Sequence, residues 1–262
     1  MTFFFALLMA IINGVGITCG VHRLFTHKSY KVITPVKIFL LVSFTSAGQN
    51  SVYQWIRDHR LHHKFSDTDA DPHNARRGLF FSHIGWLMTY KNDEVIKNGL
   101  KIDMSDIESD KVIMFFHRYS LLLNTIFCFL LPTLTNVLVW EENWKCAVAW
   151  QCFIRFLFAF HCELSVNSFA HLYGYTPYNR NILPKQNLYV AATTLGEGWH
   201  NYHHVFPFDY KAAEFFDSFN FSASLIKWWE QRGWAYDLKE ATPEIVDAFV
   251  KRMGDGEKRT EN

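Results

Sequence analysis

The sequence predicts an all-helical protein, an integral membrane bundle that carries a helical cap on its cytoplasmic side. Its composition, 49% hydrophobic and 17% aromatic, is heavy for a soluble domain of 262 residues. Long apolar runs alternate with polar segments, and histidines gather where those runs end. One domain at residues 1–256, followed by a polar tail at 257–262, accounts for the length.

The first predicted membrane span is residues 1–20, which are uncharged and mostly apolar. At about 1.5 Å per residue this run is long enough to cross a bilayer. A signal peptide is the alternative, but the run lacks a basic leading segment and a clear cleavage site, so we favour a retained span. The basic cluster from His22 to Lys31 marks this end as cytoplasmic, which places Met1 in the lumen.

The next apolar run, residues 32–47, is interrupted by Pro35 and Lys37, which favours a membrane-embedded or interfacial helix over a span. Two further spans are predicted at residues 119–140 and 144–164, joined by a tight polar connection into a helical hairpin. A chain with these three spans returns to the cytoplasmic side after the hairpin.

The spacing HxxHH occurs twice, at residues 59–63 and 200–204. Residues at i, i+3 and i+4 project from one face of a helix, and such a face can hold a metal ion. A solvated polar helix face is the alternative for one isolated HxxHH. The predicted topology, however, brings nine histidines to the cytoplasmic side: His22, His27, His59, His62, His63, His171, His200, His203 and His204.

The histidine count and spacing constrain the metal site. Five residues of ideal helix rotate the chain by about 140°, so the first span should end or unwind between His22 and His27. Nine imidazoles exceed the four ligands of tetrahedral zinc, whereas two octahedral irons can use that number. Imidazole also suits zinc and copper, so ligand chemistry alone leaves the metal open. Asn167 lies one helical turn before His171 and could hold a metal-bound water.

Charge and cysteine content exclude other classes of protein. The formal net charge of +1 gives no reason to expect a nucleic-acid partner. The five cysteines are odd in number, lie in or beside apolar runs and form no CxxC pair, which indicates small buried hydrophobic residues: Cys19, Cys128, Cys146, Cys152 and Cys162.

Five motifs together resemble the membrane acyl-CoA desaturases of the stearoyl-CoA desaturase group: GVHRLFTH at 20–27, RDHRLHHKF at 57–65, DPHN at 71–74, NSFAH at 167–171 and GEGWHNYHH at 196–204. The resemblance covers about residues 1–256. It implies that the nine histidines ligate two Fe²⁺ ions, with Asn167 reaching one iron through water, and that no other catalytic residue is needed. It also implies a fatty acyl-CoA substrate, O2 as co-substrate, cytochrome b5 as electron donor and residence in the endoplasmic reticulum membrane, with the metal site and carboxyl end cytoplasmic.

The chemistry of the residues is consistent with this resemblance. An unactivated methylene carries no acidic proton, so O2 reduced at a metal pair is one of the few sufficient oxidants. Acidic groups are needed to orient the imidazoles, and solvated loop charges are the alternative for each candidate. The candidates are Asp58, Asp67, Asp69, Asp71 and Glu197. Structural or interfacial roles are expected for the histidines outside the ligand set, His73, His83, His117 and His161.

For the substrate, the resemblance points to Asn50, Arg57, Asp58 and Lys91 near the CoA part, although each could be an interfacial surface residue. Trp55 and Trp86 are expected to line an acyl tunnel, with ordinary packing as the alternative. The family often has a basic pair where Tyr90 and Lys91 stand, and a tryptophan at the position of Leu164. These two departures leave the CoA contacts and the shape of the tunnel undetermined by the resemblance.

The family also usually has a cytoplasmic segment and one more span before the span that starts this sequence. We therefore expect a chain that inserts correctly but is weakly active or inactive. Two alternatives to a desaturase remain at this point. One is a related membrane diiron hydroxylase, and the other is a non-catalytic partner that associates with relatives as a homo- or hetero-oligomer.

Overall fold

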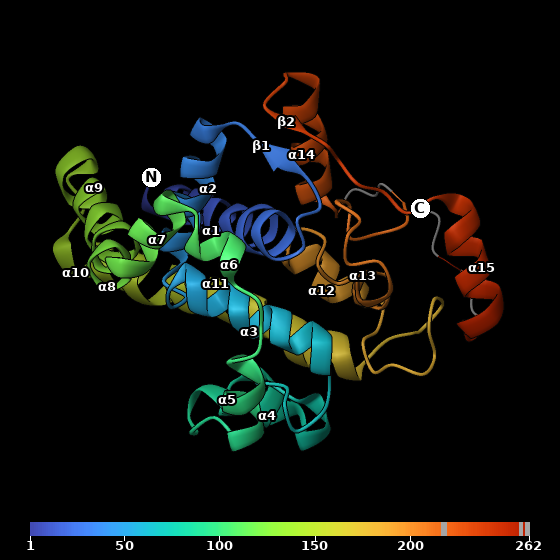
Figure 1. The fold of residues 1–262 in the computed structure, drawn as a ribbon. Helices are drawn as coiled ribbons and strands as arrows, with labels where there is room; N and C mark the ends of the chain where they lie inside the picture. Colours follow the sequence, from blue (N-terminus) through green and yellow to red (C-terminus); the bar gives the residue numbers. More distant parts are fainter. Residues whose placement is uncertain (216–218, 257–258, 260–262) are drawn as a thin grey trace.

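The computed structural model describes residues 1–215, 219–256 and 259 (Figure 1). Helices dominate the described part of the chain, and its only strands are two residues long each, which agrees with the predicted all-helical class. Three helices in this part are long and apolar enough to cross a membrane. The fold is therefore a helical bundle of the membrane type.

The first long helix consists of α1 (Thr2–Val15) and η1 (Gly16–Thr26), which continue into one another. This helix extends beyond the predicted residues 1–20. Its second half is a π-helix, a wider coil with hydrogen bonds from residue i+5 to residue i. Gly16 allows a close approach to the neighbouring helix α2 (Thr34–Ala47), since a Cβ at this position would lie 2.1 Å from the backbone nitrogen of Phe44.

Helix α2 covers most of the predicted segment 32–47. It is apolar but has only 14 residues, fewer than a membrane span requires. Pro35 stands in its first turn, where the missing N–H costs no hydrogen bond. The helix packs lengthwise against α1 and η1. Its predicted membrane-embedded or interfacial location remains a prediction.

The helical hairpin follows closely the predicted spans 119–140 and 144–164. Its first arm runs over Ser120–Trp140 and its second over Trp144–Leu172, so the second arm extends further than predicted. Glu141 takes a left-handed conformation in the connection. The first arm comprises α8 (Ser120–Asn124), η4 (Thr125–Leu130) and α9 (Leu131–Trp140), and the second comprises α10 (Trp144–Val148), η5 (Ala149–Ile154) and α11 (Arg155–Leu172).

The remaining helices form the cap. Between the first long helix and the hairpin lie α3 (Val52–Phe65), η2 (Ala75–Arg77), α4 (Leu79–His83), η3 (Gly85–Leu87), α5 (Asp93–Gly99), α6 (Ser105–Glu108) and α7 (Lys111–Arg118). After the hairpin come α12 (Leu188–Thr193), α13 (His200–Val205), α14 (Phe221–Gln231) and α15 (Pro243–Met253). In Figure 1 the hairpin turn and the carboxyl end lie at opposite ends of the molecule, with α3 and α13 between them.

A short antiparallel ladder fastens the cap to the end of the first long helix. Strand β1 (Lys31–Val32) pairs with β2 (Ala235–Tyr236), so the chain just after η1 is fixed to the segment after α14. The predicted tail at 257–262 lies outside the described residues except for Arg259, whose guanidinium contacts Glu214 at 2.7 Å.

Candidate metal centre

Nine histidines converge in two clusters where the ends of α3, α11 and α13 meet the end of the first long helix. Within each cluster the potential ligand atoms all lie within 4.8 Å of one another. The five-histidine cluster contains His22, His27, His59, His63 and His203, and the four-histidine cluster contains His62, His171, His200 and His204. These are the nine residues that the sequence analysis named.

Helix α3 divides its histidines between the clusters. His59 and His63, one turn apart, belong to the five-histidine cluster, whereas His62 belongs to the four-histidine cluster. Consecutive helical residues differ by about 100° in direction, so His62 and His63 diverge from a common edge. The HxxHH face of this helix is therefore shared between two clusters, a division that the spacing did not predict.

Helix α13 makes the opposite division. His203 joins the five-histidine cluster, while His200 and His204 join the four-histidine cluster. The two HxxHH motifs are therefore complementary. Helix α3 gives two histidines to the five-histidine cluster and one to the four-histidine cluster, and α13 gives one and two, respectively. The remaining positions are His22 in the first long helix, His27 directly after it, and His171 in α11.

His22 and His27 reach the same cluster because of the π-helical geometry of η1. The backbone N–H of His27 donates to the carbonyl of His22 at 3.1 Å, which is the i+5 to i bond of a π-turn. The two ring centroids are 4.9 Å apart. The helix widens into a π-helix and ends at Thr26, so the prediction that the span ends or unwinds between the two histidines is confirmed.

Buried carboxylates fix the orientation of three imidazoles. The Nδ1 atom of His22 lies 2.9 Å from Glu197 Oε2, that of His62 lies 2.9 Å from Asp71 Oδ2, and that of His171 lies 3.1 Å from Asp67 Oδ2. We assign the proton to Nδ1 in each case, because a carboxylate there accepts it. The Nε2 atom then presents a lone pair to the middle of its cluster.

The ring nitrogens approach one another as ligands of a common ion would. His22 Nε2 and His203 Nε2 are 2.9 Å apart, and His203 Nε2 lies 3.0 Å from His63 Nε2. His171 Nε2 and His200 Nε2 are 3.1 Å apart in the other cluster. Such groups of lone pairs repel unless protons or a cation lie between them. The donor set therefore fits a metal ion at each cluster.

Burial keeps most of these imidazoles neutral, which is the form that binds metal. Desolvation, followed by repulsion from neighbouring imidazoles, holds the pKa well below 6.5 for His27, His59, His63, His200, His203 and His204. His62 differs. Burial lowers its pKa, but the charge of Asp71 and its hydrogen bond prevail, and the pKa is raised.

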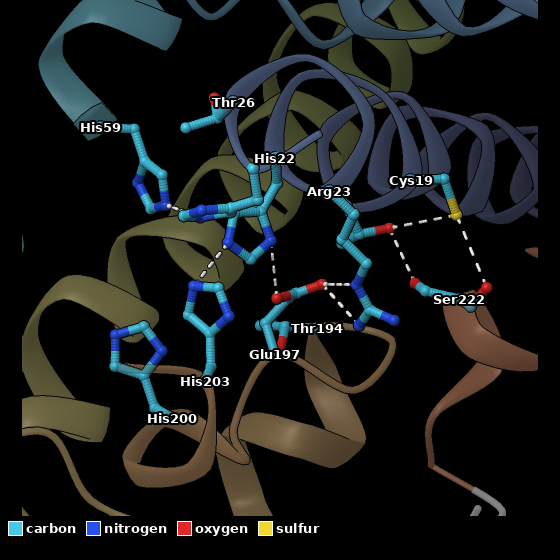
Figure 2. A network of polar contacts seen from close by, with 12 residues as sticks. Cys19, His22, Arg23, Thr26, His59, Thr194, Glu197, His200, His203 and Ser222 are labelled. Atoms are coloured by element: carbon cyan, nitrogen blue, oxygen red, sulfur yellow. Dashed lines mark hydrogen bonds and ion pairs between the residues drawn. The ribbon is translucent and has the colours of Figure 1, made fainter. Parts of the chain in front are cut away.

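Glu197 connects the five-histidine cluster to a buried arginine (Figure 2). Arg23 donates from Nη2 to Glu197 Oε1 at 2.8 Å and from Nε at 3.1 Å. Burial alone would raise the pKa of Glu197, but Arg23 and His22 lower it to about 2. Arg23 also contacts the side chain of Asn220, so the end of α14 takes part in this network. Arg23 was not predicted to have a functional role, although its position next to His22 was a usable signal.

The five candidate orienting carboxylates are not equivalent. Three of them, Asp67, Asp71 and Glu197, contact histidines of the clusters. Asp58 instead pairs with Arg57 at 3.0 Å and with the ammonium of Lys91. Asp69 is exposed in the loop after α3, which agrees with the alternative that it is a solvated loop charge.

A cavity of about 600 Å³ opens beside both clusters, where His22, His59 and His200 form part of its wall. This volume suits a drug-sized or cofactor-sized ligand. Asn167, predicted as a ligand through water, also lines the cavity. Five of the six predicted substrate residues do so as well, namely Asn50, Trp55, Asp58, Trp86 and Lys91. Arg57 is absent from this wall and pairs with Asp58.

The other four histidines have separate surroundings. His73 lies beside the four-histidine cluster, with its ring 4.4 Å from that of His62, and it also lines the cavity. His83 and His161 contact each other at 3.0 Å, and His117 Nδ1 lies 3.0 Å from Ser51 Oγ. The contact of His73 with His62, a histidine of the four-histidine cluster, was not predicted. Its place in the motif at 71–74, two residues after an orienting carboxylate, was the available signal.

The fold and the site define a helical membrane protein with a histidine-rich metal centre. The family model for fatty acid desaturases matches residues 1–249, and this chain belongs to that family. An acyl-CoA Delta-9 desaturase of Acheta domesticus is 49% identical over 256 residues, which are 97% of this chain and 71% of the relative. An acyl-CoA Delta(11) desaturase of Spodoptera littoralis is 48% identical, over 97% of this chain and 75% of the relative. A stearoyl-CoA desaturase of Homo sapiens is 46% identical, over 94% and 68% respectively.

Proposed function

We propose that the chain is an acyl-CoA desaturase that inserts a double bond into the acyl chain of a fatty acyl-CoA. The observation that carries this proposal is the double histidine cluster beside a cavity of about 600 Å³ in a member of the desaturase family. In the balanced reaction the acyl chain loses two hydrogens, and O2, two electrons and two protons complete the formation of two waters. The electrons come from cytochrome b5.

The proposed cofactor is a pair of iron ions, one for each cluster. When bound, iron supplies an oxidant strong enough for an unactivated C–H bond. The chain's own residues prepare the site: carboxylates hold the imidazoles in the ligating tautomer, and Asn167 positions a water. Trp55 stacks on His59 with ring centroids 4.9 Å apart, so it both lines the cavity and limits the movement of that imidazole.

The proposed substrate site places CoA beside polar residues of the cavity wall. Asn50 and Lys91 offer an amide and an ammonium group there. Asp58 pairs with Arg57 and Lys91 in the free protein, so CoA phosphates compete with this carboxylate for both cations. The desaturase domain at residues 1–256 would lie in the endoplasmic reticulum membrane, with both clusters and the carboxyl end in the cytoplasm.

The direct test is expression in desaturase-deficient cells, followed by gas chromatography of the cellular acyl chains. The proposed activity predicts new unsaturated chains, and none with His62→Ala at matched protein level. An alcohol that retains oxygen would instead identify a hydroxylase. Stable insertion and association with a relative, without product, would favour a non-catalytic partner.

A further inference from the structure

Glu163 is a carboxyl group in the wall of the cavity that the metal centre does not use. It belongs to α11, inside the long apolar helix Trp144–Leu172, and it lines the same cavity as His22 and His200. Ionisable residues in membrane-spanning helices are costly and face the bundle interior, where they mark functional sites. Within residues 1–215, 219–256 and 259, its carboxyl has no hydrogen-bond or ion-pair partner.

Arg155, on the same helix, shows how this fold satisfies a charge that is purely structural. Its guanidinium is buried and donates to the carbonyls of Gln151, Ser46 and Cys128. Every one of these acceptors belongs to the protein. Glu163 has no such set of partners among the described residues, which indicates that a ligand bound in the cavity supplies its hydrogen-bond partner.

The other carboxyl groups of the wall are already paired. Asp58 contacts Arg57 and Lys91, and Glu197 contacts Arg23 and His22. Of the three carboxyl groups that line the cavity, Glu163 is the one whose oxygens remain for a ligand, among the residues that the structure describes.

The position of Glu163 on α11 relates it to the reacting carbons. Phe156, Phe160, Glu163 and Asn167 all line the cavity, and their spacing of four, three and four residues places them on one helix face. The rings of Phe156 and Phe160 stack with centroids 5.7 Å apart. Glu163 lies about 6 Å along the helix axis from Asn167, at 1.5 Å per residue. It therefore separates the apolar end of this face from the metal centre.

We propose that Glu163 is a specificity residue that accepts a hydrogen bond from a hydroxyl group on the acyl chain, next to the carbons that are desaturated. This inference rests on the proposed desaturase function and names a substrate class, hydroxylated fatty acyl-CoA. A carboxyl accepts from a hydroxyl whether it is ionised or neutral, so the contact does not depend on a particular pH. An unsubstituted methylene offers nothing in return and leaves the carboxyl buried without a partner.

The test compares unsubstituted octadecanoyl-CoA with a positional series of hydroxyoctadecanoyl-CoA substrates on the purified protein. Both kcat/KM and the Kd of each acyl-CoA are measured, the latter with chelator-treated protein. We expect the wild-type protein to favour one or two adjacent hydroxyl positions roughly 10-fold, the usual scale of one satisfied buried polar group. Glu163→Leu should abolish that preference and improve binding of the unsubstituted chain, whereas Glu163→Gln should retain most of it.

Phe158→Leu is the matched control, because Phe158 lies on the same helix but is exposed on its outer face. An equal preference in the wild-type protein and in Glu163→Leu overturns the inference, and so does a preference spread evenly over all hydroxyl positions. Turnover of both substrates with no effect of Glu163→Leu leaves the desaturase function standing. A binding preference that depends on Glu163, without any turnover, would support the contact with the hydroxyl group and contradict the proposed desaturase activity.

Discussion

The two histidine clusters share their helices but differ in how they are supported. The five-histidine cluster has one orienting carboxylate, Glu197, and that carboxylate is held by a buried arginine. The four-histidine cluster has two orienting carboxylates, Asp67 and Asp71, and among the described residues no arginine side chain pairs with either carboxylate. The five-histidine cluster has more imidazole ligands, and the four-histidine cluster has more carboxylates in contact with its imidazoles. An ion bound at the four-histidine cluster would have one imidazole fewer, which would leave a position for water or another small ligand.

The largest expected effect comes from removing one ligand from each cluster. His203→Ala leaves four imidazoles in one cluster, and His62→Ala leaves three in the other. We expect both variants to lose activity by more than the roughly 10–100-fold typical of an outer orienting group. Iron content, measured by plasma mass spectrometry, should fall further in His62→Ala.

His117→Ala is the control for these substitutions, since His117 contacts Ser51 and belongs to neither cluster. Full iron content and full activity in either ligand variant would refute the assignment of that histidine. Equal iron loss in the two variants would remove the proposed difference between the clusters.

The next effect concerns the carboxylates. Asp71→Asn should lower metal affinity about 10–100-fold, because His62 loses the acceptor that fixes its tautomer. Glu197→Gln should do the same and also destabilise the fold by about 3–5 kcal/mol, because it leaves the buried guanidinium of Arg23 without its counter-charge. Metal titrations and thermal unfolding in detergent distinguish the two outcomes.

Asp69→Asn provides the matched control, since Asp69 is exposed in the same loop as Asp71. A loss of stability in Asp71→Asn as large as that in Glu197→Gln would show that the arginine makes no difference between the clusters.

A smaller effect is expected from pH on the metal-free protein. Four depressed imidazole pKa values belong to the five-histidine cluster (His27, His59, His63 and His203), and two belong to the other (His200 and His204). Below about pH 6.5 the unfolded chain binds protons at these positions that the folded chain does not. The free energy of unfolding should therefore fall as the pH decreases from 6.5. Unfolding midpoints of chelator-treated protein at pH 7.5, 6.5 and 5.5 measure this, and a pH-independent midpoint would contradict it.

The smallest expected effect is an absence of modification at Asn220, the acceptor of a glycosylation sequon. Its side chain is fully buried, donates to the carbonyl of Lys211 at 2.8 Å and contacts Arg23 behind the five-histidine cluster. We expect no change in electrophoretic mobility after endoglycosidase treatment of protein from microsomes. A glycan at this position would place the cap in the lumen and contradict the proposed cytoplasmic site.

The sequence was sufficient for the parts of the fold that depend on local pattern. Apolar runs predicted the positions of three long helices, and the histidine motifs together with the predicted topology indicated the nine residues that converge. The division of the histidines between two clusters was not predictable in this way. It depends on the angle at which α3 meets α13, and tertiary packing determines that angle.

The partners of the acidic residues also required the structure. Asp67 and Asp69 are two residues apart in one loop, yet one is buried against His171 and the other faces solvent. Loop conformation decides between them, and no periodicity encodes it. The role of Arg23 was not predictable for a related reason: its partner Glu197 lies far away in the sequence, and only the fold brings the two together.

The π-helical segment makes the metal centre sensitive to residue count as well as to residue type. Insertion of one more residue between His22 and His27 would turn His27 by about 100° further around the helix from His22. Every side chain could be conserved, and the five-histidine cluster would still be broken. Sequence change in this segment is thus constrained against insertions as well as against substitution of its histidines.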